Sequence, residues 1–279
     1  MSVKKIAVIG GDRRFFYLSQ SLLSDGFSVS VFGNESGETD IDTVLKNADV
    51  AVLPFPVSPD GVYLNARDGG NIRLIYLFEK IKLNGVKHVF GGAVSGAVSK
   101  LAEDHGISIC DYGKLEAVAL KNALCTAEGA LQIALENLPT TLHSTHACVL
   151  GYGRIGRILS RELLALGALV TGVARKDEDI AKMQIDGVKP CRFTELDKAL
   201  SGAELIYNTV PFPVMDSEVL ASLKERPLII DLASAPGGVD RSAAKKFGIS
   251  VIWALSLPGK TAPKTAAEVI KDAIASAFK

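Results

Sequence analysis

Several features that mark specialised proteins are scarce in this sequence. The four cysteines among 279 residues show neither paired metal-ligand spacing nor the density of a disulfide scaffold, and we expect them to be small core residues. The four histidines also lack ligand spacing, so we expect no metal site. No Ser-His-Asp set for nucleophilic catalysis is recognisable. The cysteines are Cys110, Cys125, Cys148 and Cys191.

An excess of one charge and long apolar runs are also missing. The 31 basic and 31 acidic side chains cancel, so no net field would attract nucleic acid or an anionic membrane. No stretch approaches the ~18 apolar residues of a membrane helix, and the apolar part of residues 1–10 is too short for a secretory signal. We therefore expect a cytoplasmic protein that acts on small molecules.

An apolar, strand-like run ending in three glycines is the most informative feature present. Residues 147–150 lead into Gly151-x-Gly153-x-x-Gly156, an amphipathic run follows, and a second apolar run begins at residue 168. In such a β-α-β unit the glycines permit a tight turn, close approach of a pyrophosphate and close packing of helix on strand. This fingerprint predicts nucleotide binding by Gly151, Tyr152, Gly153, Arg154, Ile155 and Gly156.

The end of the second strand of this unit indicates which nucleotide binds. NAD enzymes usually carry an acidic residue there to hold the ribose hydroxyls. This chain has Arg175 and Lys176, and a guanidinium offers bidentate bonds to a 2′-phosphate. We therefore favour NADP. The alternative is that Arg175 and Lys176 form an ordinary solvated loop and Asp177 takes the ribose, which would allow NAD.

Further signals follow the later predicted strands. Asn208, Thr209, Val210 and Pro211 form a turn expected beside the nicotinamide. The next strand leads into a loop from Asp231 to Asp240, where we expect cofactor contacts from Ala233 and Ser234. A Pro- and Gly-rich stretch then precedes the last helix and suits an anion such as a substrate carboxylate. Its candidate binding residues are Lys260, Thr261, Lys264 and Thr265.

The first half of the chain repeats the second at a shift of 141 positions. Residues 6–10 superpose on residues 147–151, but Asp12 and Phe15 replace the glycines that admit a pyrophosphate. We therefore interpret the first half as a substrate or docking domain. Arg13 and Arg14 begin its first helix and are candidates to clamp a carboxylate. Asp12, Glu128 and Asp231 are the candidate acid–base groups.

Each half alternates strands with helices, which predicts an α/β protein with two doubly wound parallel sheets. The N-terminal domain is expected to be flavodoxin- or Rossmann-like and the C-terminal one an NAD(P)-binding Rossmann domain. A long helix at 112–138 would join them, giving domains 1–138 and 139–279, and a final helix at 264–278 could pack back on the first domain. Expected strands are 5–9, 28–32, 50–53, 88–90 and 108–110, then 147–150, 169–173, 205–208, 228–231 and 250–253.

Four segments together resemble the family of the dipicolinate synthase A subunit. They are Ile9-Gly-Gly-Asp-Arg-Arg14, Thr126-Ala-Glu-Gly-Ala130, the loop from Asp231 to Gly238 with Asp240, and Leu257-Pro-Gly-Lys-Thr-Ala-Pro-Lys-Thr-Ala266. The likeness covers nearly the whole chain, and the last two segments are unusual outside that family.

The resemblance implies an enzyme that oxidises a dihydrodipicolinate-type product of the lysine pathway to pyridine-2,6-dicarboxylate with a nicotinamide cofactor. It also implies a partner, the flavoprotein-like B subunit of dipicolinate synthase, in the mother-cell cytoplasm of a sporulating bacterium. Homo-oligomers are expected because the joining helices could pair. Two alternatives stay open: another NADP-dependent dehydrogenase, similar to methylenetetrahydrofolate or shikimate dehydrogenases, and a non-catalytic, nucleotide-binding regulatory subunit.

Overall fold

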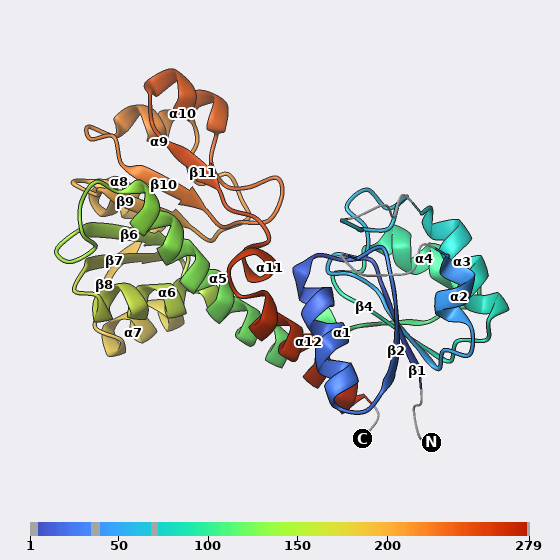
Figure 1. Cartoon of the computed structure of the whole chain (residues 1–279). Helices are drawn as coiled ribbons and strands as arrows, with labels where there is room; N and C mark the ends of the chain where they lie inside the picture. Colours follow the sequence, from blue (N-terminus) through green and yellow to red (C-terminus); the bar gives the residue numbers. More distant parts are fainter. Residues whose placement is uncertain (1–4, 35–39, 68–71, 278–279) are drawn as a thin grey trace. The chain divides into compact units, whose positions relative to one another are not determined.

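The structure is a computed structural model that describes residues 5–34, 40–67 and 72–277. The chain divides into two compact units (Figure 1). Unit 1 comprises Met1–Asn122 and Ala262–Lys279, and unit 2 comprises Ala123–Thr261. No helix in the described part of the chain has the length and hydropathy needed to cross a membrane.

Unit 1 is built on a five-stranded parallel sheet in the order β2-β1-β3-β4-β5. This is the strand order of flavodoxin-like folds. Its strands are β1 (Lys5–Ile9), β2 (Ser28–Phe32), β3 (Val50–Val52), β4 (His88–Gly91) and β5 (Ile109–Asp111). Its helices are α1 (Arg13–Ser24), α2 (Ile41–Leu45), α3 (Leu74–Leu83), α4 (Gly96–Asp104), a 3-10 turn (Tyr112–Lys114) and α12 (Pro263–Ser276).

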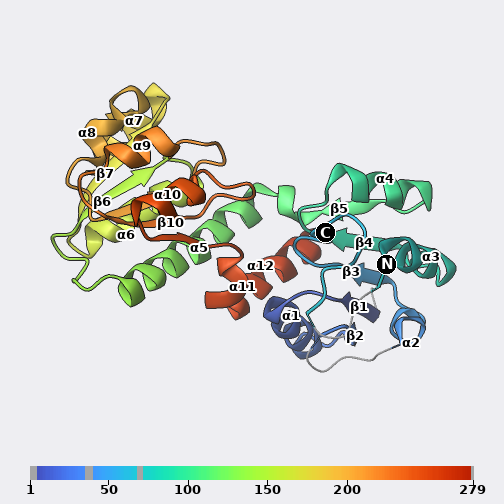
Figure 2. The same ribbon diagram turned by 90° about the horizontal axis from the view of Figure 1, so that it is seen from above.

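Helices cover both faces of this sheet, because alternate residues of a strand point to opposite sides. Ile6 and Val8 of β1 pack with α1 and α12, whereas Ala7 and Ile9 pack with α2, α3 and α4. Figure 2 shows these helices around the sheet. The C-terminal helix α12 therefore completes the core of the unit that contains the N-terminus, as the sequence allowed.

Unit 2 is built on a six-stranded parallel sheet in the order β11-β10-β9-β6-β7-β8. This corresponds to the Rossmann order and confirms the predicted fold class. Its strands are β6 (His146–Leu150), β7 (Leu169–Ala174), β8 (Lys189–Arg192), β9 (Leu205–Asn208), β10 (Leu228–Asp231) and β11 (Val251–Trp253). Its helices are α6 (Arg154–Ala165), α7 (Asp177–Ile185), a 3-10 turn (Phe193–Glu195), α8 (Leu196–Leu200), α9 (Ser217–Ser222), α10 (Arg241–Phe247) and α11 (Leu257–Thr261).

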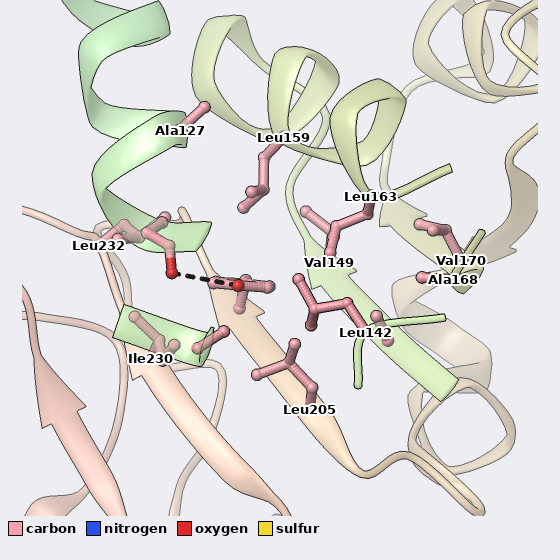
Figure 3. Close-up of a cluster of buried hydrophobic side chains, with 14 of the residues drawn as sticks. Ala127, Leu142, Val149, Leu159, Leu163, Ala168, Val170, Leu205, Ile230 and Leu232 are labelled. Atoms are coloured by element: carbon pink, nitrogen blue, oxygen red, sulfur yellow. Dashed lines mark hydrogen bonds between the residues drawn. The ribbon is translucent and has the colours of Figure 1, made fainter. Parts of the chain in front are cut away.

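The long helix α5 (Glu116–Asn137) begins in unit 1 and contributes most of its length to unit 2. In unit 2, its Ala127 packs in one core cluster with Leu159 and Leu163 of α6 and with Val149 of β6 (Figure 3). The buried Tyr207 hydroxyl in this cluster donates to the carbonyl of Ala130 at 3.2 Å. Small side chains on α5 let it approach the sheet closely.

The observed units differ from the predicted domains at the boundary within α5, and residues 262–279 belong to unit 1, as the sequence allowed for the final helix. The sequence placed the division after residue 138, at the end of the long helix, but the structure places it at Asn122 and Ala123. The reason is packing: the later turns of α5 bury Ala127, Ala130 and Ala134 in the core of unit 2. Part of the Pro- and Gly-rich stretch that precedes the last helix is itself helical, because Leu257–Thr261 forms the short helix α11.

Candidate functional site

The predicted cofactor residues of unit 2 gather at one edge of its sheet. Gly151, Arg175, Thr209 and Leu232 follow directly after β6, β7, β9 and β10, which are parallel neighbours in the sheet. Their carboxyl ends therefore face the same edge, where open α/β sheets bind ligands.

The glycine motif forms a cradle with space for a ligand. Gly151 adopts a φ of +92°, and a Cβ there would lie 2.4 Å from Oγ1 of Thr209. That hydroxyl donates to the carbonyl of Leu150 at 2.9 Å and so fixes the turn to β9. By contrast, a Cβ at Gly153 would meet no atom within 4 Å. The motif thus combines a packed inner side with an open outer side.

Helix α6 begins directly behind this open position. Gly153 is its N-cap, and no described side chain caps the helix there. The first amide N–H groups of a helix have no partner within the helix and carry partial positive charge. Arg154 and Ile155 begin α6, and Gly156 packs against the backbone of Gly151. This arrangement fits the pyrophosphate of a dinucleotide.

Tyr152, the residue between the first two glycines, anchors the cradle to α7. Its buried side chain donates from the hydroxyl to Oδ2 of Asp186 at 3.0 Å. Nε of Arg157 donates to the same oxygen at 2.7 Å. The bond from Arg157 holds the pKa of the Asp186 carboxyl below its usual value, and burial raises the pKa of the Tyr152 hydroxyl.

The turn after β9 and the loop after β10 are joined by a buried carboxylate. Asp231 is 1% exposed, and its Oδ1 accepts from Nδ2 of Asn208 at 2.8 Å and from N of Ala233 at 3.1 Å. Its Oδ2 accepts from N of Gly238 at 2.9 Å. Asn208 also accepts from N of Val210 at 3.0 Å. Asp231 therefore holds the two loops together, and we interpret it as a positioning residue.

The exposed parts of these two loops are available to a ligand. Pro211 and Ser234 are exposed at the surface, and Thr209 and Val210 are half-buried. Ala233 is buried, and its carbonyl accepts from Nε1 of Trp253 at 2.9 Å.

The other two candidate acid–base groups also lie in defined environments. Asp12 caps α1 and forms an ion pair with Arg14, whose Nε lies 2.8 Å from Oδ1. Glu128 is exposed on α5. Burial, together with the nearby charge of Glu128, raises the pKa of Glu162 on α6. Of the three candidates, Asp12 and Asp231 are thus committed to contacts within the protein.

The two arginines of unit 1 differ sharply. Arg14 is 4% exposed, and its Nη2 donates to Oδ2 of Asp12 at 2.8 Å and to the carbonyl of Phe55 at 2.7 Å. Its guanidinium already has a carboxylate partner, which corrects the expectation that both arginines form a clamp. Arg13 is exposed and has no ion pair within the described residues. It is the arginine that remains available to a substrate.

The second predicted anion anchor is divided between the units. Lys260 is exposed on α11 in unit 2, and the hydroxyl of Thr261 donates to the carbonyl of Leu257 at 2.7 Å. Lys264 and Thr265 are exposed in the first turn of α12, in unit 1.

Within unit 1, Arg13 and Lys264 lie at the same end of a helix pair. Ser21 bonds Glu268 at 2.6 Å, and Asp25 pairs with Lys271 at 2.9 Å. Because both contacts advance in the same direction along both chains, α1 and α12 run parallel. Their amino-terminal ends therefore share one side of unit 1, where Arg13 and Lys264 are both exposed.

Two parts of the sequence match known protein families. Residues 5–113 match the family model of the N-terminal domain of the dipicolinate synthase A subunit, and residues 125–246 match that of the D-isomer specific 2-hydroxyacid dehydrogenase, NAD binding domain. The dipicolinate synthase A subunit of Bacillus subtilis (strain 168) is 29% identical over 282 residues, which cover 97% of this chain and 94% of that protein.

Solved structures of a dipicolinate synthase A subunit and of a D-lactate dehydrogenase are similar to this chain. The crystal structure of the dipicolinate synthase A subunit from Bacillus halodurans has a TM-score of 0.88 and 27% identity, covering 98% of this chain and 97% of that one. D-lactate dehydrogenase from Escherichia coli has a TM-score of 0.65 and 16% identity, covering 97% of this chain and 95% of that one, and shows the shared fold.

The match of residues 125–246 agrees with the cradle geometry and supports a nicotinamide-dependent oxidoreductase. The N-terminal match separates the chain from general 2-hydroxyacid dehydrogenases. Residues 5–113 therefore match the N-terminal domain of the dipicolinate synthase A subunit, and the chain over nearly its whole length is similar to such A subunits in sequence and fold.

Proposed function

We propose that this chain oxidises a dihydrodipicolinate-type intermediate of the lysine pathway to pyridine-2,6-dicarboxylate with NADP. The observation that carries the proposal is the nucleotide cradle of Gly151, Gly153 and Gly156 in a chain that is similar to dipicolinate synthase A subunits. The family match favours this reaction over those of methylenetetrahydrofolate or shikimate dehydrogenases.

The nicotinamide, when bound, supplies a hydride acceptor, and forming the aromatic ring supplies much of the driving force. The substrate loses a hydride and a proton, and the proton leaves to solvent. The protein therefore mainly binds and orients. Gly153 and the start of α6 would hold the pyrophosphate. Pro211 and Ser234 are the exposed residues that would flank the nicotinamide, and Arg13 and Lys264 would bind the substrate carboxylates.

The choice of NADP rests on the end of β7. Arg175 and Lys176 are both exposed there, and neither side chain has an acceptor within the described residues. A 2′-phosphate would supply one.

We further propose that the chain acts with a flavoprotein-like B subunit in the mother-cell cytoplasm of a sporulating bacterium. Its relatives are named as the A subunit of their synthase, which supports a second, partner subunit. Homo-oligomerisation belongs to the same proposal, since α5 exposes Leu124 and Leu135.

One observation favours a second function, that of a nucleotide-binding regulatory subunit. Asp12 and Asp231, two of the three candidate acid–base carboxylates, are engaged by donors of the protein itself. A regulatory subunit would bind the nucleotide without turnover.

Absorbance distinguishes the two functions. The purified chain is mixed with freshly generated dihydrodipicolinate and NADP, with and without the B subunit. Coupled growth of the pyridine-dicarboxylate and reduced-nicotinamide bands would establish the oxidation. Dipicolinate formation no faster than in a blank, together with measurable binding of NADPH, would favour the regulatory subunit.

A further inference from the structure

The strand β8 places a third basic side chain at the cofactor edge. In the sheet register, Arg192 is the partner of Ala174, the last residue of β7. Nη1 of Arg192 donates to the carbonyl of Arg175 at 3.4 Å, and its Nη2 donates to Oδ1 of Asp177. Arg192 therefore contacts the two residues that flank Lys176.

The three acidic residues at the start of α7 are all paired with basic side chains. Helix α7 begins with three carboxylates. Asp177 pairs with Arg192, while Nζ of Lys182 lies 2.5 Å from Glu178 and 3.3 Å from Asp179. The cations left without an acidic partner at this edge, within the described residues, are Arg175 and Lys176. Pairing thus lets the segment from Arg175 to Asp179, which contains three carboxylates, present positive charge.

Arg192 also keeps donors for a ligand. A guanidinium has five N–H donors, of which these two bonds use two. Its side chain is 48% exposed, so the guanidinium is accessible to a ligand. A 2′-phosphate is a doubly charged acceptor that such a fork suits.

We infer that Arg192 determines cofactor specificity, by neutralising the carboxylate of Asp177 and by binding the 2′-phosphate of NADP together with Arg175 and Lys176. The inference rests on the proposed function in its choice of NADP. Without Arg192, Asp177 would be free to bind the ribose hydroxyls of NAD and would repel a 2′-phosphate. An ordinary surface ion pair, in contrast, would leave the choice of cofactor unchanged.

Equilibrium binding tests this on the full chain. The fluorescence of NADPH and NADH is titrated with wild type, Arg192→Gln, Arg192→Lys and Lys189→Gln. Lys189 is exposed at the other end of the same strand, so its substitution removes one positive charge from β8 away from the cofactor edge. Thermal unfolding of each variant shows whether it folds. Adenosine 2′,5′-bisphosphate, compared with adenosine 5′-monophosphate, probes the 2′-phosphate subsite without the nicotinamide.

We expect Arg192→Gln to raise the Kd for NADPH by at least about tenfold, which corresponds to the loss of one charge-assisted bond. The Kd for NADH should stay equal or fall. Arg192→Lys should be intermediate, because it keeps the charge and loses the fork. Lys189→Gln should match wild type. In the background Asp177→Asn, the effect of Arg192→Gln on NADPH should shrink by the part that came from neutralisation.

Two failures are distinct. If wild type prefers NADPH and folded Arg192→Gln keeps the wild-type ratio of the two Kd values, the inference is overturned and the proposed function stands. If wild type shows no preference for NADPH, the proposed choice of NADP fails and the role of Arg192 fails with it. A loss of NADPH affinity in Lys189→Gln equal to that in Arg192→Gln would also overturn it, because general charge would then explain both.

Discussion

At the scale of single residues, Gly153 and Gly156 perform different tasks within one motif. Gly153 has a φ of −77°, which any residue adopts, and open space where its side chain would be. A Cβ at Gly156 would lie 2.1 Å from the carbonyl oxygen of Gly151. Gly153 therefore reserves space for a ligand, and Gly156 allows close packing of α6 on the turn.

This contrast gives a prediction for Gly153→Val. The variant should fold normally, with a Tm within about 2 °C of wild type, because a Cβ at this position meets no heavy atom within 4 Å. Its Kd for NADPH should rise by at least about tenfold, because the isopropyl group occupies the space for the pyrophosphate. Nucleotide titration and thermal unfolding measure the two quantities.

Gly156→Ala is the matched control. It adds a single methyl group, yet that group would collide with backbone, so Tm should fall together with affinity. Retained nucleotide affinity in Gly153→Val would refute the cradle.

The sequence indicated the role of residues whose contacts are local in sequence. It did not indicate the role of residues whose hydrogen-bond partners are distant in sequence. The glycine motif could be interpreted directly, because each glycine acts within its own turn. Arg14 could not, because the carbonyl it binds belongs to Phe55, 41 positions away. Asp231 was a candidate base for the same reason, since its donors include Asn208, 23 positions away.

At the scale of elements, the contacts of Asp186 join the glycine turn to α7. Asp186 follows the end of α7 and accepts from Tyr152, within the glycine turn, and from Arg157 of α6. Its side chain is 8% exposed. Two elements that bracket the cofactor edge thus share one buried carboxylate.

The lowered pKa of Asp186 gives a prediction of pH dependence. A depressed pKa means that the folded state favours the carboxylate, so its stabilisation is complete above the unfolded pKa of about 3.9 and is lost as pH falls through the folded pKa. Asp186→Asn should lower Tm by about 3 °C at pH 7. The difference from wild type should shrink below about pH 4, as thermal unfolding over pH 3 to 7 would show.

Glu178→Gln is the control on the same helix. Glu178 also has a lowered pKa from its bond with Lys182, but it is exposed, and such pairs contribute little. Its Tm should change by less than about 2 °C at every pH. Equal and pH-independent losses in both variants would contradict the role of Asp186.

Most strands were predictable from the sequence, whereas β8 was not. Buried parallel strands are short apolar runs, and the expected segments lie within one residue, at each end, of β1–β7 and β9–β11. Strand β8 reads Lys189-Pro-Cys-Arg192 and lies at the sheet edge. A polar strand that contains proline gives no apolar signal, although an edge tolerates both. The omission concealed Arg192.

At the scale of the whole molecule, the two units are assembled differently from the chain. Unit 2 is continuous in sequence, whereas unit 1 takes its last helix from the other end. Helix α12 buries Ala267, Ile270 and Ile274 in the core that α1 and β1 share. The repeat at 141 positions predicted two α/β units, but it could not fix the boundary, because packing rather than repetition assigns α5 and α12.

Because unit 2 is continuous in sequence, we expect it to fold and to bind the nucleotide without unit 1. A fragment of residues 123–261 should fold, because its core and sheet are complete, and it should bind NADPH with a Kd within about tenfold of the full chain. Circular dichroism with thermal scans measures the folding, and nucleotide titration shows whether the cradle is complete within unit 2. A folded fragment with no affinity for NADPH would mean that residues of unit 1 are needed to hold the nucleotide.

The opposite behaviour is expected of unit 1 without its last helix. A fragment of residues 1–122 should not fold alone, because it lacks Val269, Ile270 and Ile274 of α12, each of which contributes about 1.5–3 kcal/mol when buried. Adding a peptide of residues 262–279 should restore a cooperative thermal transition, measured by circular dichroism. The matched control is a peptide with Ile270→Asp and Ile274→Asp, which places charges in that core and should restore nothing. If residues 1–122 unfold cooperatively by themselves, α12 is not an essential part of the core of unit 1.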